Sequence, residues 1–492
     1  MRTGKNLFVL VVCIAALMLT LGIPASASAH VTGTSAGANW GIHTIVVAPN
    51  HHDDTANLQA AFNTCTTHNW VCSIQLVRGT YYTDQIYAIG FQGSFAGAGS
   101  GLTVVQALPN MPSPSPACNT GSSPFWACAP GPTNPWPNLF TFVNGAFQVS
   151  GISFNEPYAA PTQGWYAWGA TSALAALDNL LLVTGTQATA TIDHITLAGG
   201  PGDAGGWNMG QAICYCGMLL PAGWVDAVAD ALPISGSFSL VSSSFYFSDA
   251  PLWVENTLDA SVTAAFNVAN TEEAVVGFFD ISATQLWVYG NYGTNISLFA
   301  GVGGVQSVYK TSGLLPSTVY VEDNVFLNVN DAGDGVVAED LSAYYGEAPT
   351  LSAVVSGNIV QTDVSCGCYL PIYGALDFGM LSSFVASNNL IIGGASGIYA
   401  AYGDPGAIRG NVIEGASIGI WLDAATGINV TGNWIKNSPQ YGIEVTDGSS
   451  NIVVSYNVVK NSGLDDLYWD QTGTNDLWYG NIYATSSPAT LP

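Results

Sequence analysis

Asp423 and Glu444 stand near the C-terminal end in a pattern that suits acid–base chemistry. They belong to short phrases that each follow a glycine: GIYAAY from Gly397, GIWLDA from Gly419 and GIEVTD from Gly442. The first and third residues after each glycine are apolar, so in a strand the second and fourth residues point to the opposite side. If the phrases stack as neighbouring strands, the Cβ atoms of Asp423 and Glu444 should lie roughly 8 Å apart. Inverting glycosidases hold their two carboxyl groups about 6.5–9.5 Å apart, which makes this pair a candidate acid and base; a plain solvated face explains the same pattern.

Aromatic residues and further acids occupy the same outward positions. The second positions carry Tyr399, Trp421 and Tyr468, which are candidates for binding sugar rings. Asp470 occupies the fourth position one phrase after Glu444 and is a fallback catalytic residue. If the chemistry lies elsewhere, the other candidates are three acids in a Trp-containing loop, Asp203, Asp226 and Asp230.

The phrases are parts of a longer repeat centred on asparagine. Asn411, Asn433, Asn457 and Asn481 follow one another at intervals of 22, 24 and 24 residues, with large apolar residues three before and two after each. Such a period indicates stacked supersecondary units, and the two-residue alternation indicates strands. The intervals leave no room for helices between the strands, so the repeat predicts a parallel β-helix. The asparagines should then stack in one column at a bend and bond from rung to rung.

The same repeat extends upstream with longer intervals. Its earlier asparagines are Asn267, Asn291, Asn324, Asn358 and Asn389, and Ser243 holds the equivalent place before them. We therefore expect one continuous solenoid.

The N-terminal part of the mature chain carries a family resemblance. DDTANLQAAF from Asp53 predicts a short amphipathic helix, capped by Asp54 or Thr55, with Leu58 and Phe62 on its apolar face. Together with IQLVRGTYY and FAGAGSGLTVV, this succession resembles the N-terminal entry of the pectin-lyase-like right-handed β-helix superfamily. The resemblance implies an all-β, right-handed parallel β-helix with an N-terminal capping helix.

The resemblance is specific for fold and says little about activity. The superfamily contains lyases, hydrolases, epimerases and proteins without catalysis. The sequence lacks the Asn-Thr-Asp, Asp-Asp and His-Gly set of its pectin-type glycosidases, and the Arg-x-x-x-Arg of its pectate lyases. Asp331 to Gly335 resembles a calcium loop faintly, and a turn explains it more simply. We therefore expect no cofactor, with calcium left open.

Residues 1–29 have the features of a secretory signal peptide. Arg2 and Lys5 precede an apolar run, and Ala27-Ser28-Ala29 forms the cleavage site. We expect an exported protein without a membrane-inserted segment. Residues 30–492 should form a single β-helix domain, with cap and first rungs at 30–105, rungs with long Trp- and Pro-rich loops at 106–236, regular rungs at 237–483 and a tail at 484–492.

The mature chain is strongly acidic. It retains 5 cationic side chains against 33 carboxylates, which gives a net charge of 5 − 33 = −28. Such a surface disfavours nucleic acid as a partner and also polyuronides, whose recognition usually needs several Arg or Lys. It suits an acidic habitat, where protonated carboxylates leave the surface nearly neutral.

Eight cysteines remain after the signal peptide, which fits an oxidising compartment. Cys65 with Cys72, and Cys118 with Cys128, are expected to form local disulfides. Two Cys-x-Cys pairs, Cys214/Cys216 and Cys366/Cys368, are open to three interpretations: pairing with each other, a bridge within each pair, or a zinc site.

These features favour extracellular carbohydrate as the partner. The lead hypothesis is hydrolysis of a neutral polysaccharide by a carboxylate pair. The alternatives are a non-catalytic β-helix that binds glycans or builds the cell surface, and a polyuronate lyase or epimerase. The oligomeric state cannot be read from the sequence.

Overall fold

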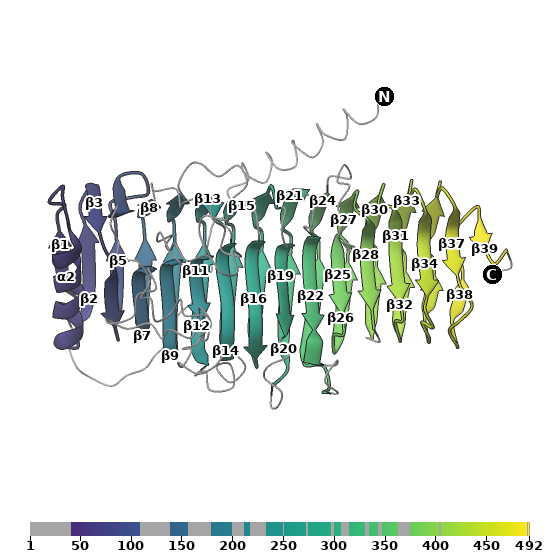
Figure 1. Cartoon of the computed structure of the whole chain (residues 1–492), viewed down its shortest axis with the longest axis horizontal. Coiled ribbons are helices and arrows are strands. Elements are labelled where there is room, and N and C mark those ends of the chain that lie inside the picture. Colours follow the sequence, from purple (N-terminus) through teal and green to yellow (C-terminus); the bar gives the residue numbers. More distant parts are fainter. Residues whose placement is uncertain are drawn as a thin grey trace, which may run out of the picture. The chain divides into compact units, whose positions relative to one another are not determined.

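The computed structural model describes a solenoid of parallel strands that stack in chain order (Figure 1). The described residues are 41–108, 138–155, 179–198, 211–216, 233–248, 250–271, 274–296, 300–306, 314–329, 334–342, 347–362, 374–402, 405–489 and 491. Residues 42–492 belong to one compact unit. Within the described part, every pairing between named strands is parallel, which confirms the predicted parallel β-helix.

Each turn of the solenoid contributes strands to three faces. Face 1 consists of β4 (Ile86–Ile89), the first parts of β7 (Asn138–Ser150), β9 (Asn179–Asp193) and β14 (Ala250–Ala265), and β11 (Gln211–Cys216), β16 (Ala274–Ser282), β19 (Ala300–Gln306), β22 (Asp334–Asp340), β25 (Leu376–Gly379), β28 (Ser396–Ala401), β31 (Ile418–Asp423), β34 (Tyr441–Thr446), β37 (Asp465–Trp469) and β39 (Ser486–Ser487).

Face 2 follows face 1 in each turn. It consists of the second parts of β7, β9 and β14 together with β1 (His43–Val47), β2 (Val71–Leu76), β5 (Gln92–Ala96), β12 (Ile234–Val241), β17 (Gln285–Tyr289), β20 (Ser317–Glu322), β23 (Leu351–Ser356), β26 (Ser383–Ser387), β29 (Gly406–Arg409), β32 (Ile428–Thr431), β35 (Val453–Ser455) and β38 (Leu477–Tyr479).

Face 3 completes the turn with short strands. They are β3 (Gly79–Thr83), β6 (Thr103–Ala107), β8 (Ser153–Asn155), β10 (Thr196–Ala198), β13 (Ser244–Ser248), β15 (Val268–Thr271), β18 (Tyr292–Thr294), β21 (Val325–Val329), β24 (Ile359–Thr362), β27 (Leu390–Ile392), β30 (Val412–Glu414), β33 (Trp434–Lys436) and β36 (Val458–Lys460).

The predicted asparagine column lies at the bend between faces 2 and 3. The side-chain amide of Asn411 donates to Oδ1 of Asn433 at 3.0 Å, and the amide of Asn433 donates to Oδ1 of Asn457 at 2.9 Å. The same bond recurs from Asn267 to Asn481, and the backbone N–H of Ser243 donates to Asn267 at the head of the column. The register assumed from the sequence is therefore confirmed.

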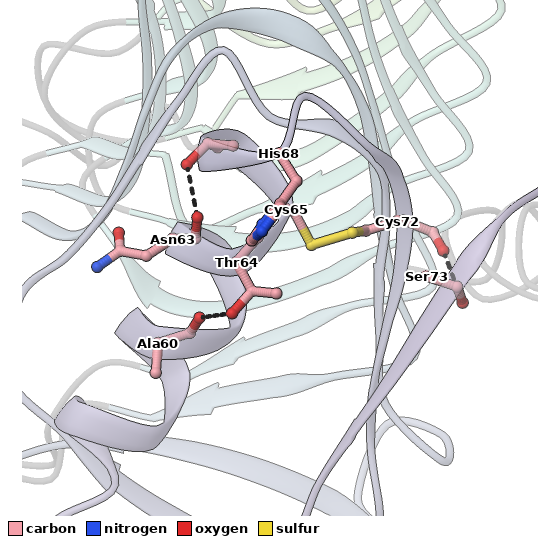
Figure 2. The surroundings of a disulfide bond; sticks show 9 residues. Ala60, Asn63, Thr64, Cys65, His68, Cys72 and Ser73 are labelled. Carbon is pink, nitrogen blue, oxygen red and sulfur yellow. Dashed lines mark hydrogen bonds between the residues drawn. A yellow bond between two sulfur atoms is a disulfide. The ribbon is translucent and has the colours of Figure 1, made fainter. Parts of the chain in front are cut away.

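Helix α2 (Thr55–Thr67) packs against β1, β2 and β4 at the N-terminal end of the stack. Leu58 and Phe62 are fully buried, as expected, and the Phe62 ring contacts four phenylalanine rings of the first rungs: Phe91, Phe95, Phe140 and Phe142. The predicted disulfide Cys65–Cys72 joins α2 to β2 (Figure 2). The cap is thus fixed to the first rungs by packing and by a covalent bond.

The predicted helix cap differs in detail. Asp54 occupies the N-cap position, but its side chain makes no capping bond to the helix. Its two carboxylate oxygens accept the backbone N–H groups of Asn50 at 2.8 Å and Tyr82 at 3.1 Å. Asp54 therefore ties the helix start to β3 instead of satisfying the first helical turn.

The structure describes one of the two Cys-x-Cys pairs. Cys214 and Cys216 form a disulfide with each other, one of the three interpretations left open. Cys118, Cys128, Cys366, Cys368 and the predicted signal peptide 1–29 lie outside the described residues. No helix in the described part of the chain is long and apolar enough to cross a membrane.

Candidate functional site

The outward residues of face 1 form two adjacent columns near the C-terminal end. Strand pairing places Tyr399 opposite Trp421, Trp421 opposite Glu444, and Glu444 opposite Tyr468. The neighbouring column contains Asp423, which pairs with Thr446. The predicted columns are therefore present, and Asp423 and Glu444 are diagonal neighbours on β31 and β34.

Burial separates these columns from the core. The residues that alternate with them, Ile398, Ile420, Ile443 and Leu467, are completely buried. Trp421, Asp423, Glu444 and Tyr468 are half-buried. This strand alternation presents the acids and rings to the outside because their neighbours fill the solenoid interior.

Asp423 is held by two partners. The hydroxyl of Tyr399 donates to its Oδ2 at 2.9 Å. The carboxyl group of Asp447 lies beside that of Asp423 and interacts with it. Burial raises the pKa of Asp423, and the neighbouring carboxyl group of Asp447 raises it further, while the hydrogen bond from Tyr399 opposes this rise.

Glu444 is a carboxylic acid that keeps its proton at mildly acidic pH. Burial, followed by the charges of Asp423, Asp447 and Asp470, raises its pKa to about 7. Its Oε2 atom is buried and has no hydrogen-bond partner. An unpaired, buried oxygen favours the neutral form, because an ionised carboxylate there would lack both water and a donor.

Asp470, the fallback residue on β37's C-terminal flank, organises the turn beside the pair. Its Oδ2 accepts the backbone N–H of Asp447 at 2.8 Å, and its Oδ1 accepts the backbone N–H of Thr472 at 2.9 Å. These bonds hold Asp447 in place next to Asp423. Asp447 was not among the predicted site residues, although it is the last residue of the GIEVTD phrase. It lies in a turn and has a φ of 54°.

The aromatic residues of the site differ in exposure: Trp421, Tyr441 and Tyr468 are partly exposed, and Tyr399 is buried. Trp421 donates its indole N–H to Thr446 at 3.0 Å, and the rings of Tyr441 and Tyr468 lie 4.6 Å apart, beside Glu444. These residues are half-buried and present part of their rings to solvent.

Tyr399 does not match its predicted role. We expected it to be exposed for sugar binding, but it is only 4% exposed. Its ring packs against Trp421 with centroids 4.9 Å apart, and its hydroxyl bonds to Asp423. Tyr399 is therefore placed to hold Asp423.

Three further acids on face 1 were not predicted as site residues. Glu339 and Asp377 repeat, on β22 and β25, the diagonal relation of Asp423 and Glu444, because Val337 pairs with Asp377 and Glu339 with Gly379. Asp334 lies at the start of β22. The sequence contains a sign of Glu339: the phrase GVVAE from Gly335 aligns with GIYAA from Gly397 and places Glu339 at an outward position. The spacing between these upstream phrases is irregular, which hides the match.

Face 1 is free of cationic side chains in the part that the structure describes. Arg78 lies between β2 and β3, Arg409 belongs to β29, and Lys436 and Lys460 belong to face 3. Among the same residues, no three His, Cys, Asp or Glu are arranged to hold a metal ion. Asp203, Asp226 and Asp230 lie outside the described residues. The chemistry available at the described site is that of neutral and ionised carboxyl groups beside aromatic rings.

The comparisons with known proteins concern the fold. Residues 303–485 match the family model described as right handed beta helix region. Comparison with curated proteins finds no match. The matched range contains β22 through β38, and thus the whole candidate site.

Solved structures with a similar trace include a binding protein and two enzymes. The surface adhesin PfbA of Streptococcus pneumoniae is 15% identical, with a TM-score of 0.46, covering 79% of this chain and 92% of the adhesin. The GH87 alpha-1,3-glucanase of Streptomyces thermodiastaticus is 10% identical, with a TM-score of 0.45, covering 92% and 71%. The family 28 exopolygalacturonase of Yersinia enterocolitica is 10% identical, with a TM-score of 0.45, covering 89% and 79%. Similarities of this degree say nothing about activity. The match to the right handed beta helix region shows that the chain is a right-handed parallel β-helix, as the resemblance implied.

Proposed function

We propose that this protein is an exported enzyme that hydrolyses glycosidic bonds in a neutral extracellular polysaccharide. In this proposal Glu444 is the general acid that protonates the leaving oxygen. Asp423, beside Asp447, is the base that takes a proton from the attacking water. Trp421 and Tyr468 bind the sugar rings on either side.

The observation that carries the proposal is the different environment of the two acids. Glu444 has a pKa of about 7 because it is buried and faces three other carboxylates, so it holds a proton at mildly acidic pH. The pKa of Asp423 is raised as well, but Asp423 accepts a hydrogen bond from Tyr399 that opposes the rise, whereas Oε2 of Glu444 has no such donor. Pairs of acids whose environments differ in this way are typical of general acid–base catalysis.

The strand geometry is compatible with inversion. Diagonal neighbours on adjacent parallel strands have Cβ atoms roughly 8 Å apart, from one rung spacing and two residues along the strand. Inverting glycosidases leave about 6.5–9.5 Å between their carboxyl groups, which accommodates the water. We therefore propose that the product has inverted configuration at the anomeric carbon.

A neutral substrate and an extracellular location complete the proposal. The described part of face 1 carries no Arg or Lys that could neutralise a uronate, and the acidic chain would repel one. Aromatic rings bind sugars through their C–H faces and need no charge. The signal-like residues 1–29 support export.

Reducing-end release from a panel of neutral polysaccharides, measured at mildly acidic pH, tests the proposal. The same panel is run with the wild type, with Glu444→Gln and with Asp259→Asn as a remote control. We expect release by the wild type and the control, and a loss of at least about 100-fold in Glu444→Gln. Binding of a glycan without release would instead support a non-catalytic surface protein, and formation of unsaturated uronate would support a lyase.

A further inference from the structure

A second group of acids on face 1 is buried upstream of the candidate site. Asp334 and Asp377 are only 7% and 3% exposed, and Glu339 is half-buried. Strands β22 and β25 pair directly, so Glu339 and Asp377 are diagonal neighbours. We call these three residues the buried acid cluster.

The cluster lacks a neutralising partner among the described residues. The strands packed against it, β19, β21, β23 and β24, carry no titratable side chain, and β28 contributes only Tyr399. Asp340 ends β22 and is occupied by bonds from Ser342, Thr350 and Leu351. Oδ1 of Asp334 and Oδ1 of Asp377 are buried and accept no hydrogen bond.

Ionising such a group is unfavourable. A buried carboxylate without a cation or donor loses its hydration and gains nothing in return. Accordingly, burial raises the pKa of Asp334 well above its usual range, and the charges of Asp377 and Glu339 raise it further. Burial and the charge of Glu339 do the same for Asp377, and burial alone raises the pKa of Glu339.

We propose that the buried acid cluster is a pH-sensitive switch. It keeps its protons and packs tightly in acid, and it loosens β22 and β25 when it ionises at higher pH. The inference rests on the position and burial of the three acids and does not depend on the proposed function.

The direction follows from proton linkage. The folded chain holds protons that the unfolded chain releases above about pH 4, the ordinary range of Asp and Glu. The stabilisation is therefore complete below that range and is lost as pH rises through the raised pKa values of the cluster. A protein of this kind is more stable in acid than at neutral pH.

Tyr399 connects the buried acid cluster to the candidate site. Asp377 pairs with Tyr399 on the next strand, and the hydroxyl of Tyr399 donates to Asp423. Loosening of β25 would release the support of Tyr399. Ionisation of the cluster is thus expected to disturb the position of Asp423 as well.

Hydrogen–deuterium exchange of the full chain at about pH 4 and about pH 7, corrected for intrinsic rates, tests this inference. We expect β22 and β25 to lose protection at the higher pH by more than 10-fold relative to β29 and β32, which lie away from the cluster. In a variant with Asp334→Asn, Glu339→Gln and Asp377→Asn, this pH effect should disappear, whereas Asp259→Asn, an exposed control, should retain it. Equal protection of β22 and β25 at both pH values in the wild type would overturn the proposal, as would an unchanged pH effect in the triple variant.

A second measurement needs no variant. Calorimetric unfolding of the wild type near pH 6, in buffers of different ionisation enthalpy, counts the protons released when the chain unfolds. We expect release of about two to four protons per chain: about one from Glu444, whose pKa is about 7, and one to three from the cluster, which ionises on exposure. Proton uptake, or no exchange of protons at this pH, would contradict a cluster that is protonated in the folded state.

Discussion

At the scale of single residues, the candidate site depends on carboxyl groups that alter each other's pKa. Glu444 is surrounded by Asp423, Asp447 and Asp470, and each of these charges makes its ionisation harder. Asp447 also raises the pKa of Asp423. If Glu444 is the general acid, activity must fall as pH rises through about 7, because the deprotonated form cannot serve the leaving group.

Replacing Asp447 should shift the pH at which activity falls on the alkaline side of the pH profile, here called the alkaline limb. In Asp447→Asn one negative charge beside Glu444 is removed, so the pKa of Glu444 falls and the alkaline limb of kcat/KM moves to lower pH, by roughly half a pH unit or more. The pH profile of kcat/KM measures it. Asp465→Asn, on the neighbouring rung, is the control and should leave the limb in place. An alkaline limb at the wild-type position in Asp447→Asn would show that Glu444 does not set it.

Tyr399 is expected to act as a positioning residue. Its hydroxyl favours the ionised form of Asp423, so in Tyr399→Phe the pKa of Asp423 rises and the acid limb moves to higher pH. Loss of a hydrogen bond to a charged group costs about 1.5–3 kcal/mol, which corresponds to a decrease in kcat of roughly 10- to 150-fold. We expect KM to change little, since the buried ring does not reach solvent. The exposed Tyr456→Phe is the matched control, and a change confined to KM would argue that Tyr399 binds the sugar after all.

At the scale of elements, the asparagine column explains how irregular loops coexist with a constant register. Each side chain joins two rungs by bonds to the next asparagine and to a backbone carbonyl, as Asn433 does with Asn457 and Ile408. The repeat could be read from the sequence because the asparagine is needed at one fixed place in every turn, whatever the length of the loop. The outward positions of Asp423 and Glu444 follow in the same way, from the alternation that the phrases after Gly419 and Gly442 share.

Removing one asparagine should destabilise the stack locally. Asn433→Ala removes the acceptor of the backbone N–H of Asn411 and the side-chain donor to the carbonyl of Ile408. The side-chain amide of Asn411 loses one of its two acceptors and keeps the carbonyl of Ala386. Unsatisfied buried groups cost about 1–3 kcal/mol each, so we expect a loss of roughly 2–5 kcal/mol in the free energy of opening of the adjacent rungs. Hydrogen exchange of β30 and β33 measures it. The exposed Asn429→Ala in β32 is the control and should cost under about 1 kcal/mol; a similarly small effect of Asn433→Ala would mean that the column does not hold the rungs together.

Other parts of the site could not be read from the sequence, for physical reasons. Outward direction follows from strand alternation, but burial of an outward residue depends on its neighbours, and Tyr399 is buried between Asp377 and Trp421. Glu339 and Asp377 lie in the part of the repeat where the intervals between asparagines are long and irregular. An alignment of the regular phrases therefore does not include them. Asp447 lies in a turn, and its bond to Asp423 depends on the bend that Asp470 fixes.

At the scale of the whole molecule, the solenoid grows in one direction and needs protection at its first rung. Helix α2 supplies it by inserting Phe62 among phenylalanine rings of the first turns, and the Cys65–Cys72 bond holds the helix in place. The resemblance of DDTANLQAAF and its neighbours to a superfamily entry predicted this arrangement. An open sheet edge at this end would be a template for pairing with other chains.

Weakening the cap should therefore loosen the stack from its N-terminal end. Phe62→Ala removes a fully buried ring and is expected to cost about 3–5 kcal/mol. Loss of exchange protection should begin at β1 and β2 and decrease along the rungs, because each rung contacts mainly its neighbours. The exposed Asn63→Ala on the same helix is the control. Uniform loss of protection along the whole solenoid would contradict a local role of the cap.

The central claim is that Asp423 and Glu444 hydrolyse a glycosidic bond with inversion, and proton NMR of the freshly released product tests it most directly. The measurement follows the anomeric signals over time on the polysaccharide that gives the strongest reducing-end release, for the wild type and for the Asp423→Asn/Glu444→Gln double variant. We expect the first product of the wild type to have inverted anomeric configuration, with which the strand geometry is compatible, and we expect the double variant to release none above background. Full turnover by the double variant, or a first product of retained configuration, would contradict it.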